Sequence, residues 1–119
     1  MAEETNTTPP VAAKPPPTIH EAERASGASG AILWGAEMEF AAAVTRRQGG
    51  FDVVVRGQDA NANRRLALQI ESAVGPAKRQ VPHSLSAGPL ALPHFQQVKP
   101  PPSGHTFYET DKMKARRKP

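Results

Sequence analysis

The fold is decided by residues 49–59, which read GGFDVVVRGQD. The valines at 53–55 are β-branched, and such residues are enriched in strands. Glycine bounds this apolar run on both sides, so the pattern predicts a short strand over residues 51–56. Asp59 or Asn61 can then cap a following helix, because a short polar side chain accepts hydrogen bonds from the first free backbone N–H groups.

Apolar residues recur at helical spacing on both sides of this strand. Residues 31–48 predict one helix, which ends at the pair Gly49-Gly50. Residues 59–74 predict a second helix, which ends at Gly75 and Pro76 because glycine and proline interrupt helices.

The C-terminal third reads as a loop followed by two strands. Proline and glycine punctuate residues 76–91 and predict a long loop. Residues 92–98 and 105–109 predict strands, joined by the stiff proline-rich connection at 100–104. The order helix, strand, helix, strand, strand indicates an α+β fold, in which two helices pack on a small sheet that ends in an antiparallel C-terminal hairpin.

The N-terminal segment differs in composition from the rest of the chain. Residues 1–30 combine clustered prolines with few large apolar side chains. Such a segment buries too little apolar surface to offset the entropy of ordering it. We therefore expect a disordered proline-rich leader over residues 1–30, with residues 26–30 as a flexible joint, and a single domain over residues 31–119.

Composition narrows the classes of protein. The chain has 119 residues and no cysteine, which removes disulfides and thiolate metal sites. Neither a signal segment nor a long apolar run is present, so the sequence predicts a soluble, cytoplasmic protein with no membrane partner.

The net charge of +4 favours a polyanionic partner such as RNA. A solvated basic tail that only keeps the protein soluble is the alternative. The candidate nucleic-acid-binding residues are Lys112, Lys114, Arg116, Arg117 and Lys118 near the C-terminus, together with Arg64 and Arg65 at the start of the second helix.

Several common sites are missing from the sequence. It contains no glycine-rich phosphate loop, no His-Glu-x-x-His motif and no serine nucleophile elbow. Asp52 could hold a metal, but no second carboxylate and lysine follow it at a useful distance. We therefore predict neither a cofactor nor a metal.

The candidate catalytic pair is His94 and His105. RNA can be cleaved without metal when one group takes the proton of the 2′-hydroxyl and a second protonates the departing 5′-oxygen. Histidine suits both steps because its pKa lies near neutral pH. A hairpin with its turn near Pro100 would bring the two histidines opposite each other, with Tyr108 and Thr106 positioning the phosphate.

Strand alternation sets a condition on this pair. If Phe95 and Phe107 both point into one core, His105 shares the inward face and cannot meet His94. The pair then requires that Tyr108 takes the buried face, or that a bulge intervenes. Otherwise His105 is an interior histidine and His94 an edge residue. Outside the pair, His83 reads as a solvated loop residue.

Four strings resemble a known group of proteins. They are DVVVRG at 52–57, ANRRLA at 62–67, PHFQ at 93–96 and GHTFYE at 104–109. Together they resemble the C-terminal toxin modules of bacterial polymorphic (RHS-type and contact-dependent) toxin systems, over residues 45–117. Many such modules are nucleases that are delivered into a target cell and have a cognate immunity protein, which is what the resemblance implies here. Such modules usually end very long carrier proteins, whereas this chain begins with its own methionine.

These observations support three hypotheses. The first is a toxin-type nuclease, namely a metal-independent ribonuclease in which His94 and His105 act as acid and base. The second is a non-catalytic nucleic-acid-binding or adaptor protein whose basic end supplies affinity. The third is a toxin that acts on a protein or a nucleotide.

Overall fold

The computed structural model describes residues 14–81 and 88–119, and it contains two helices and one seven-stranded mixed sheet. The predicted α+β fold is confirmed. The elements are β1 (Thr18–Arg24), β2 (Ile32–Met38), α1 (Phe40–Gln48), β3 (Val53–Arg56), α2 (Ala60–Val74), β4 (Ala77–Gln80), β5 (His94–Gln97), β6 (Thr106–Tyr108) and β7 (Arg116–Arg117).

The predicted central strand is β3, which lies in the middle of the sheet order β4-β5-β6-β3-β1-β2-β7. It pairs antiparallel with β1 and parallel with β6, and β6 pairs antiparallel with β5 as the C-terminal hairpin. All three valines of β3 are fully buried. Both faces of the strand are therefore covered, which explains an unbroken β-branched run instead of an alternating one.

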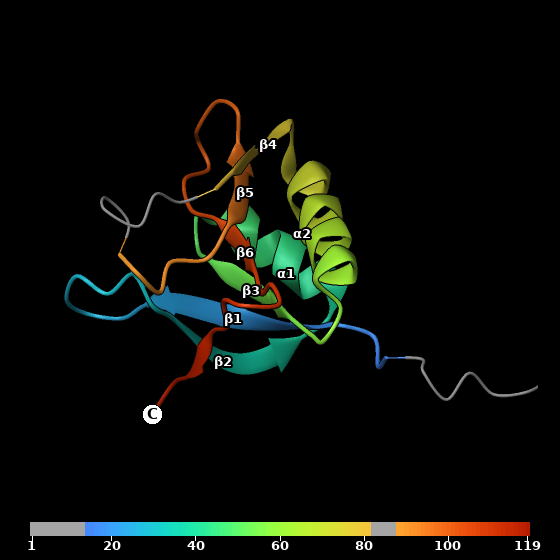
Figure 1. Ribbon diagram of the computed structural model, residues 1–119. Helices are drawn as coiled ribbons and strands as arrows, with labels where there is room; N and C mark the ends of the chain where they lie inside the picture. The colour runs from blue at the N-terminus through green and yellow to red at the C-terminus, as the bar shows by residue number, and fades with distance from the viewer. Residues whose placement is uncertain (1–13, 82–87) are drawn as a thin grey trace, which may run out of the picture.

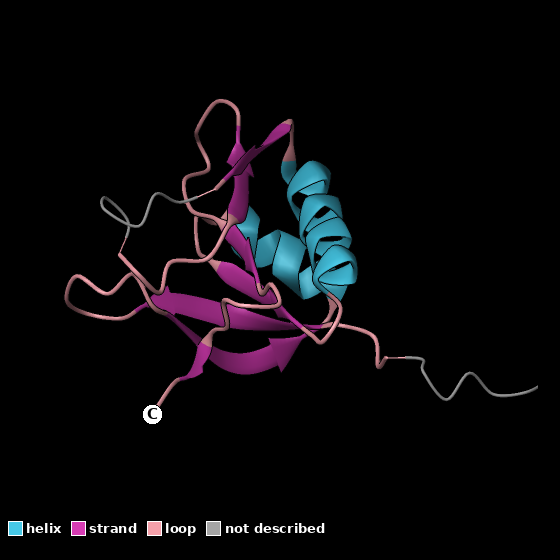
Figure 2. Ribbon diagram, in the orientation of Figure 1, coloured by secondary structure: helices cyan, strands magenta, loops and turns pink. Residues whose placement is uncertain are grey.

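The two faces of the sheet are covered differently. Helices α1 and α2 pack on one face (Figure 2), over a cluster that includes Val53, Val55 and Ile70. On the helix-free face, Val54 and Phe107 belong to a second cluster. In that cluster they pack with Ala115, from the chain that leads from β6 to β7 at the far edge of the sheet.

The N-terminal boundary differs from the predicted one. Residues 18–24 form β1 inside the sheet, so the folded domain begins well before residue 31. The predicted joint at 26–30 is the turn between β1 and β2, where Gly27 and Gly30 adopt positive φ angles of 91° and 77°. The short-range glycine pattern was interpreted as a linker because the strand before it was not recognised.

The first predicted helix is wrong over its N-terminal half. Residues 32–38 form β2, and only α1, from Phe40, is helical. Pairing with β1 gives the backbone of β2 its hydrogen bonds and buries Ile32. This long-range pairing outweighs a helical spacing of apolar residues that arises by coincidence.

The other differences lie at the edges of the sheet. Part of the predicted loop at 76–91 is β4, which pairs with β5. Part of the basic end is β7, which pairs with β2. His83 lies outside the described residues. The second helix was predicted correctly: α2 is capped by Asp59, whose carboxylate accepts hydrogen bonds from the N–H groups of Asn61 and Ala62.

A buried ion pair ties the helices to the loop before β6. Arg47 of α1 and Glu71 of α2 are both fully buried, and two N–H groups of Arg47 donate to the carboxylate oxygens of Glu71 at 2.9 Å. Arg47 also donates to the Ser103 carbonyl at 2.8 Å, and Thr106 donates to Glu71 at 2.8 Å. The position of His105 therefore depends on this network, because the network holds the residues on both sides of it.

Among the described residues, no helix combines the length and apolar character that crossing a bilayer would require.

Candidate functional site

The structure brings His94 and His105 together on the helix-free face. Their ring centres are 4.5 Å apart and their planes meet at 73°. Tyr108 stacks on Phe95 in the helix-covered core, whereas Phe107 packs in the cluster on the other face. The condition that alternation sets is thus met. His94 lies opposite Phe107 in the β5–β6 ladder, and His105 shares its face because it comes two residues before Phe107.

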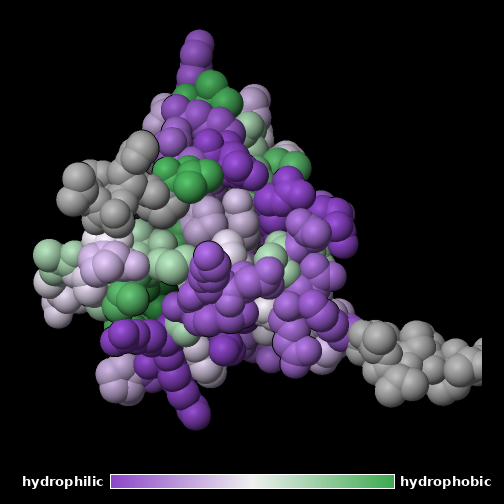
Figure 3. Space-filling model, in the orientation of Figure 1, coloured by the Kyte–Doolittle hydropathy of each residue, from purple (hydrophilic) through white to green (hydrophobic). Residues whose placement is uncertain are grey.

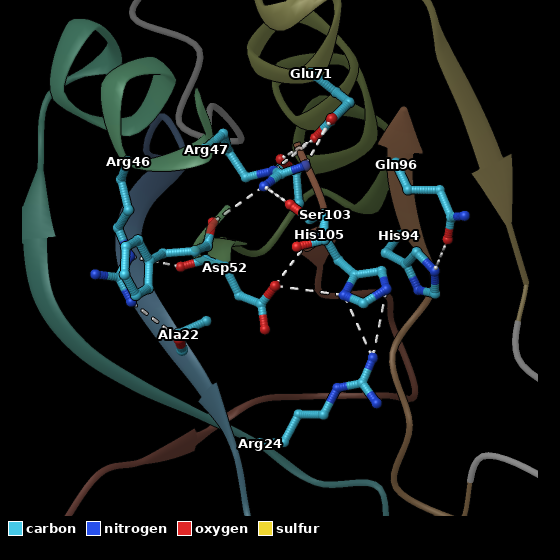
Figure 4. Close-up of polar contacts among 12 residues, drawn as sticks. Ala22, Arg24, Arg46, Arg47, Asp52, Glu71, His94, Gln96, Ser103 and His105 are labelled. Carbon is cyan, nitrogen blue, oxygen red and sulfur yellow. Dashed lines mark hydrogen bonds and ion pairs between the residues drawn. The ribbon is translucent and has the colours of Figure 1, made fainter. Parts of the chain in front are cut away.

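The ring of His105 lies between the carboxylate of Asp52 and the guanidinium of Arg24 (Figure 4). Its backbone N–H donates to Oδ1 of Asp52 at 2.8 Å, and its Nδ1 lies 3.4 Å from the same oxygen. On its other side, Nη2 of Arg24 lies 3.3 Å from Nδ1 and 3.4 Å from Nε2. Asp52 directly precedes β3, and Arg24 is the last residue of β1, the strand that pairs with β3.

The carboxyl group of Asp52 is held ionised. Burial by itself would raise its pKa, but hydrogen bonds from the His105 side chain and backbone, with the charges of His105 and Arg24, lower the pKa below its ordinary value of 3.8. A carboxylate therefore faces His105 at neutral pH, where it can orient the ring and accept its N–H.

His94 is the more enclosed histidine. Its Nε2 lies 3.0 Å from Oε1 of Gln96, and its Nδ1 is buried without a hydrogen-bond partner in the described part of the chain. Burial lowers the pKa of His94 from its ordinary value of 6.5, and the charge of His105 lowers it further. His94 is therefore a neutral imidazole at pH 7, which is the form that accepts a proton.

This shift predicts a pH dependence of stability. The folded-state pKa of His94 lies below 6.5, so between these two values the unfolded chain binds more protons than the folded chain. The contribution of His94 to the free energy of unfolding is therefore fully present above pH 6.5. It is lost as the pH falls through the folded-state pKa. We expect the free energy of unfolding, measured by urea denaturation at pH 5 to 8, to fall below pH 6.5. His94→Gln should flatten this slope, and an unchanged slope would contradict the assignment.

Two of the predicted site residues lie elsewhere. Thr106 is fully buried on the helix-covered face and donates its hydroxyl to Glu71. Tyr108 points to the same face. Neither contacts the two imidazoles, because residues 106 and 108 alternate with 105 and 107 across the sheet. The predicted role of Thr106 and Tyr108 beside His94 and His105 is therefore wrong.

The predicted basic residues are divided between two regions. Arg64 and Arg65 are exposed on α2. The C-terminal basic residues are exposed at the opposite edge, where β7 pairs with β2 and Lys118 forms a 3.0 Å ion pair with Glu23. Figure 3 shows hydrophilic side chains over much of the face seen in Figure 1.

Two arginine side chains lie close to the ring of Trp34. The guanidinium carbon of Arg56 is 3.9 Å from the ring centre of Trp34, and that of Arg117 is 5.7 Å from it. Arg56 is itself held by Glu109 at 3.2 Å. Trp34 lies on β2, half-buried beside His20.

Sequence reasoning missed Arg24 as a partner of His105, and it considered Asp52 only as a metal ligand. The described residues contain no group of three or more histidine or acidic side chains that could hold a metal ion. Arg24 was placed in the leader, so its contact with a residue 81 positions away had no local signal. Asp52 did carry a signal, because it directly precedes Val53, the first residue of the buried central strand.

Comparison of the chain with protein-family models, curated proteins and solved structures gives no match. The resemblance to polymorphic toxin modules therefore stays a prediction.

Proposed function

We propose that the protein is a toxin-type, metal-independent ribonuclease in which His94 and His105 carry the proton transfers. The observation that supports this most directly is the approach of the two imidazole rings to 4.5 Å on the helix-free face. Ionised Asp52 and the exposed guanidinium of Arg24 lie beside them. This set supplies a base, an acid and a cation for phosphate, the three parts that metal-free cleavage of RNA needs.

In the proposed step, the RNA displaces the Gln96 side chain from Nε2 of neutral His94, and this nitrogen takes the proton of the ribose 2′-hydroxyl, because Nδ1 is buried. The 2′-oxygen then forms a bond to phosphorus while the bond from phosphorus to the 5′-oxygen breaks. His105 gives a ring proton to the departing oxygen. The products are a 2′,3′-cyclic phosphate and a free 5′-hydroxyl, so no water or metal enters this step. Each positioned acid or base typically contributes about 10²–10⁴-fold to the rate.

Asp52 and Arg24 have separate roles in this proposal. The carboxylate of Asp52 positions His105 through both its backbone and its ring. Arg24 is exposed, and it contacts the His105 ring through Nη2 alone. When an RNA phosphate arrives, the guanidinium can exchange this weak contact for two parallel hydrogen bonds to phosphate oxygens. That exchange also frees the ring nitrogen that Arg24 contacts.

A cleavage assay tests the proposal. Full-length protein is incubated with tRNA in EDTA, next to His94→Gln, His105→Gln and the matched control His20→Gln. His20 is buried in β1, and its ring bonds Thr18 and the Gly35 carbonyl. We expect cleavage by the wild type and by His20→Gln, and a loss of about 10²–10⁴-fold in each of the other two variants.

The circular dichroism of each variant shows whether it is folded. Intact RNA with the wild type, or cleavage that persists in both folded variants of the pair, would overturn the proposal.

One observation favours a second candidate, a non-catalytic nucleic-acid-binding module. Trp34 with Arg56 and Arg117 forms a cation-rich aromatic surface on which a base can stack. For this function, RNA would bind with a steep salt dependence and remain uncut, and both histidines of the pair would be dispensable.

A further inference from the structure

Two arginines and a buried tyrosine line a cavity that the proposed chemistry does not use. The cavity measures about 270 Å³ and lies where α2 begins, next to the ends of β4 and β6. Arg64 comes from the first turns of α2, Arg79 from β4 and Tyr108 from β6. Tyr108 is only 4% exposed, yet it forms part of the cavity wall.

The charges around this cavity are positive. None of the ion pairs between described residues involves Arg64 or Arg79. Burial raises the pKa of the Tyr108 hydroxyl, and the charges of Arg79 and Arg64 oppose this rise without reversing it. The hydroxyl thus keeps its proton at neutral pH and can donate a hydrogen bond. Two guanidinium groups and a phenol are donors that suit the oxygens of a phosphate.

The cavity extends to the residue that precedes His94 in the chain. Pro93, which precedes His94, lines it, and the Pro93 carbonyl accepts a hydrogen bond from the backbone N–H of Tyr108. A second, mostly apolar cavity of about 330 Å³ shares Pro93 with the first and extends to Met113, which packs against the cluster on the helix-free face. The two cavities therefore adjoin each other at the start of β5.

We propose that Arg64, Arg79 and Tyr108 form a phosphate-binding subsite that holds a neighbouring phosphodiester of the RNA strand whose scissile phosphate lies at His94 and His105. The inference rests on the proposed function for the identity of the strand. The subsite requires a substrate longer than a dinucleotide, because a dinucleotide has one phosphodiester and cannot occupy both places. Arg64 and Tyr108 thereby contribute to binding from the helix-covered face.

The test uses the full chain with His94→Gln and His105→Gln combined, which prevents cleavage of the probe. Its affinity for a 5′-fluorescein single-stranded RNA hexanucleotide is measured by anisotropy, with Arg64→Ala, Arg79→Ala or Tyr108→Phe added. We expect about tenfold weaker binding for each arginine variant and about threefold weaker binding for Tyr108→Phe. The control is Lys99→Ala, which removes an exposed cation that does not line the cavity.

The outcomes separate the subsite from the proposed function. Equal weakening by Lys99→Ala and Arg64→Ala would overturn the subsite, since it would show general attraction to exposed positive charge. In the catalytically intact chain, Arg79→Ala should raise KM for the hexanucleotide with kcat unchanged, and leave dinucleotide cleavage as it was. If the wild type cuts no RNA but the selective loss of affinity remains, the ribonuclease proposal fails and the phosphate subsite stands.

Discussion

Glu71→Leu is expected to destabilise the domain by about 3–5 kcal/mol, because it leaves the guanidinium of Arg47 buried without its carboxylate. Both side chains are fully buried, so water cannot replace the lost partner. Thr106 and Gln97 would also lose the acceptor of their side-chain hydrogen bonds. In a domain of this size the melting temperature should fall by roughly 20 °C.

Urea and thermal denaturation followed by circular dichroism measure this effect. The double variant Arg47→Met with Glu71→Leu should recover most of the loss, because it removes the second charge together with the first. Glu37→Leu, at an exposed position of β2, is the control and should change stability by less than about 1 kcal/mol. A Glu71→Leu variant as stable as this control would contradict the role given to the ion pair.

Gly104→Ala is expected to reduce both stability and RNA cleavage. Gly104 has a φ of +97°, which costs an alanine about 1–2 kcal/mol. A Cβ there would also lie 2.7 Å from Nη1 of Arg47 and 2.8 Å from the Gly50 carbonyl oxygen, and 3.1 Å from Oδ1 of Asp52. Relief of these contacts requires movement of the loop, at a further cost of about 1–3 kcal/mol.

Gly27→Ala provides the matched comparison. Gly27 has a similar φ of +91°, but nothing lies within 4 Å of an added Cβ. It should show only the cost of the left-handed backbone, and cleavage should be unchanged. Because Gly104 directly precedes His105 and its Cβ would press on Asp52, cleavage by Gly104→Ala should fall even at a temperature where the variant is fully folded. Equal effects of the two substitutions would rule out this explanation.

The sequence predicted the parts of the fold that depend on near neighbours in the chain. Three local features act over only a few residues: the β-branched run of β3, the cap at Asp59 and the proline before His94. Their structural effect can therefore be predicted without knowledge of tertiary contacts. The pairing of the C-terminal strands was also predicted, because a short connection favours a hairpin. The resulting prediction of His94 and His105 as neighbours needed one further fact, the face that Tyr108 takes.

Elements whose formation depends on distant partners were predicted poorly. Strands β1, β2, β4 and β7 lie outside the predicted sheet, since each takes its hydrogen bonds from a strand that local propensity does not identify. The predicted leader contains β1, in which Ile19 and Ala22 are the only buried apolar residues. With so few apolar side chains, the segment resembled a disordered one. The sheet that buries them is built mostly from residues after position 31.

The same distinction between local and long-range information applies to the candidate site. The sequence alone determined which residue types could transfer protons and that they lie on adjoining strands. Only the tertiary structure decided that His105 has Asp52 on one side and Arg24 on the other, and that Thr106 and Tyr108 face the helices. The physical reason is the two-residue period of a strand combined with long-range pairing. A local pattern predicts that side chains alternate, but the face each set occupies is decided by what the rest of the chain packs against it.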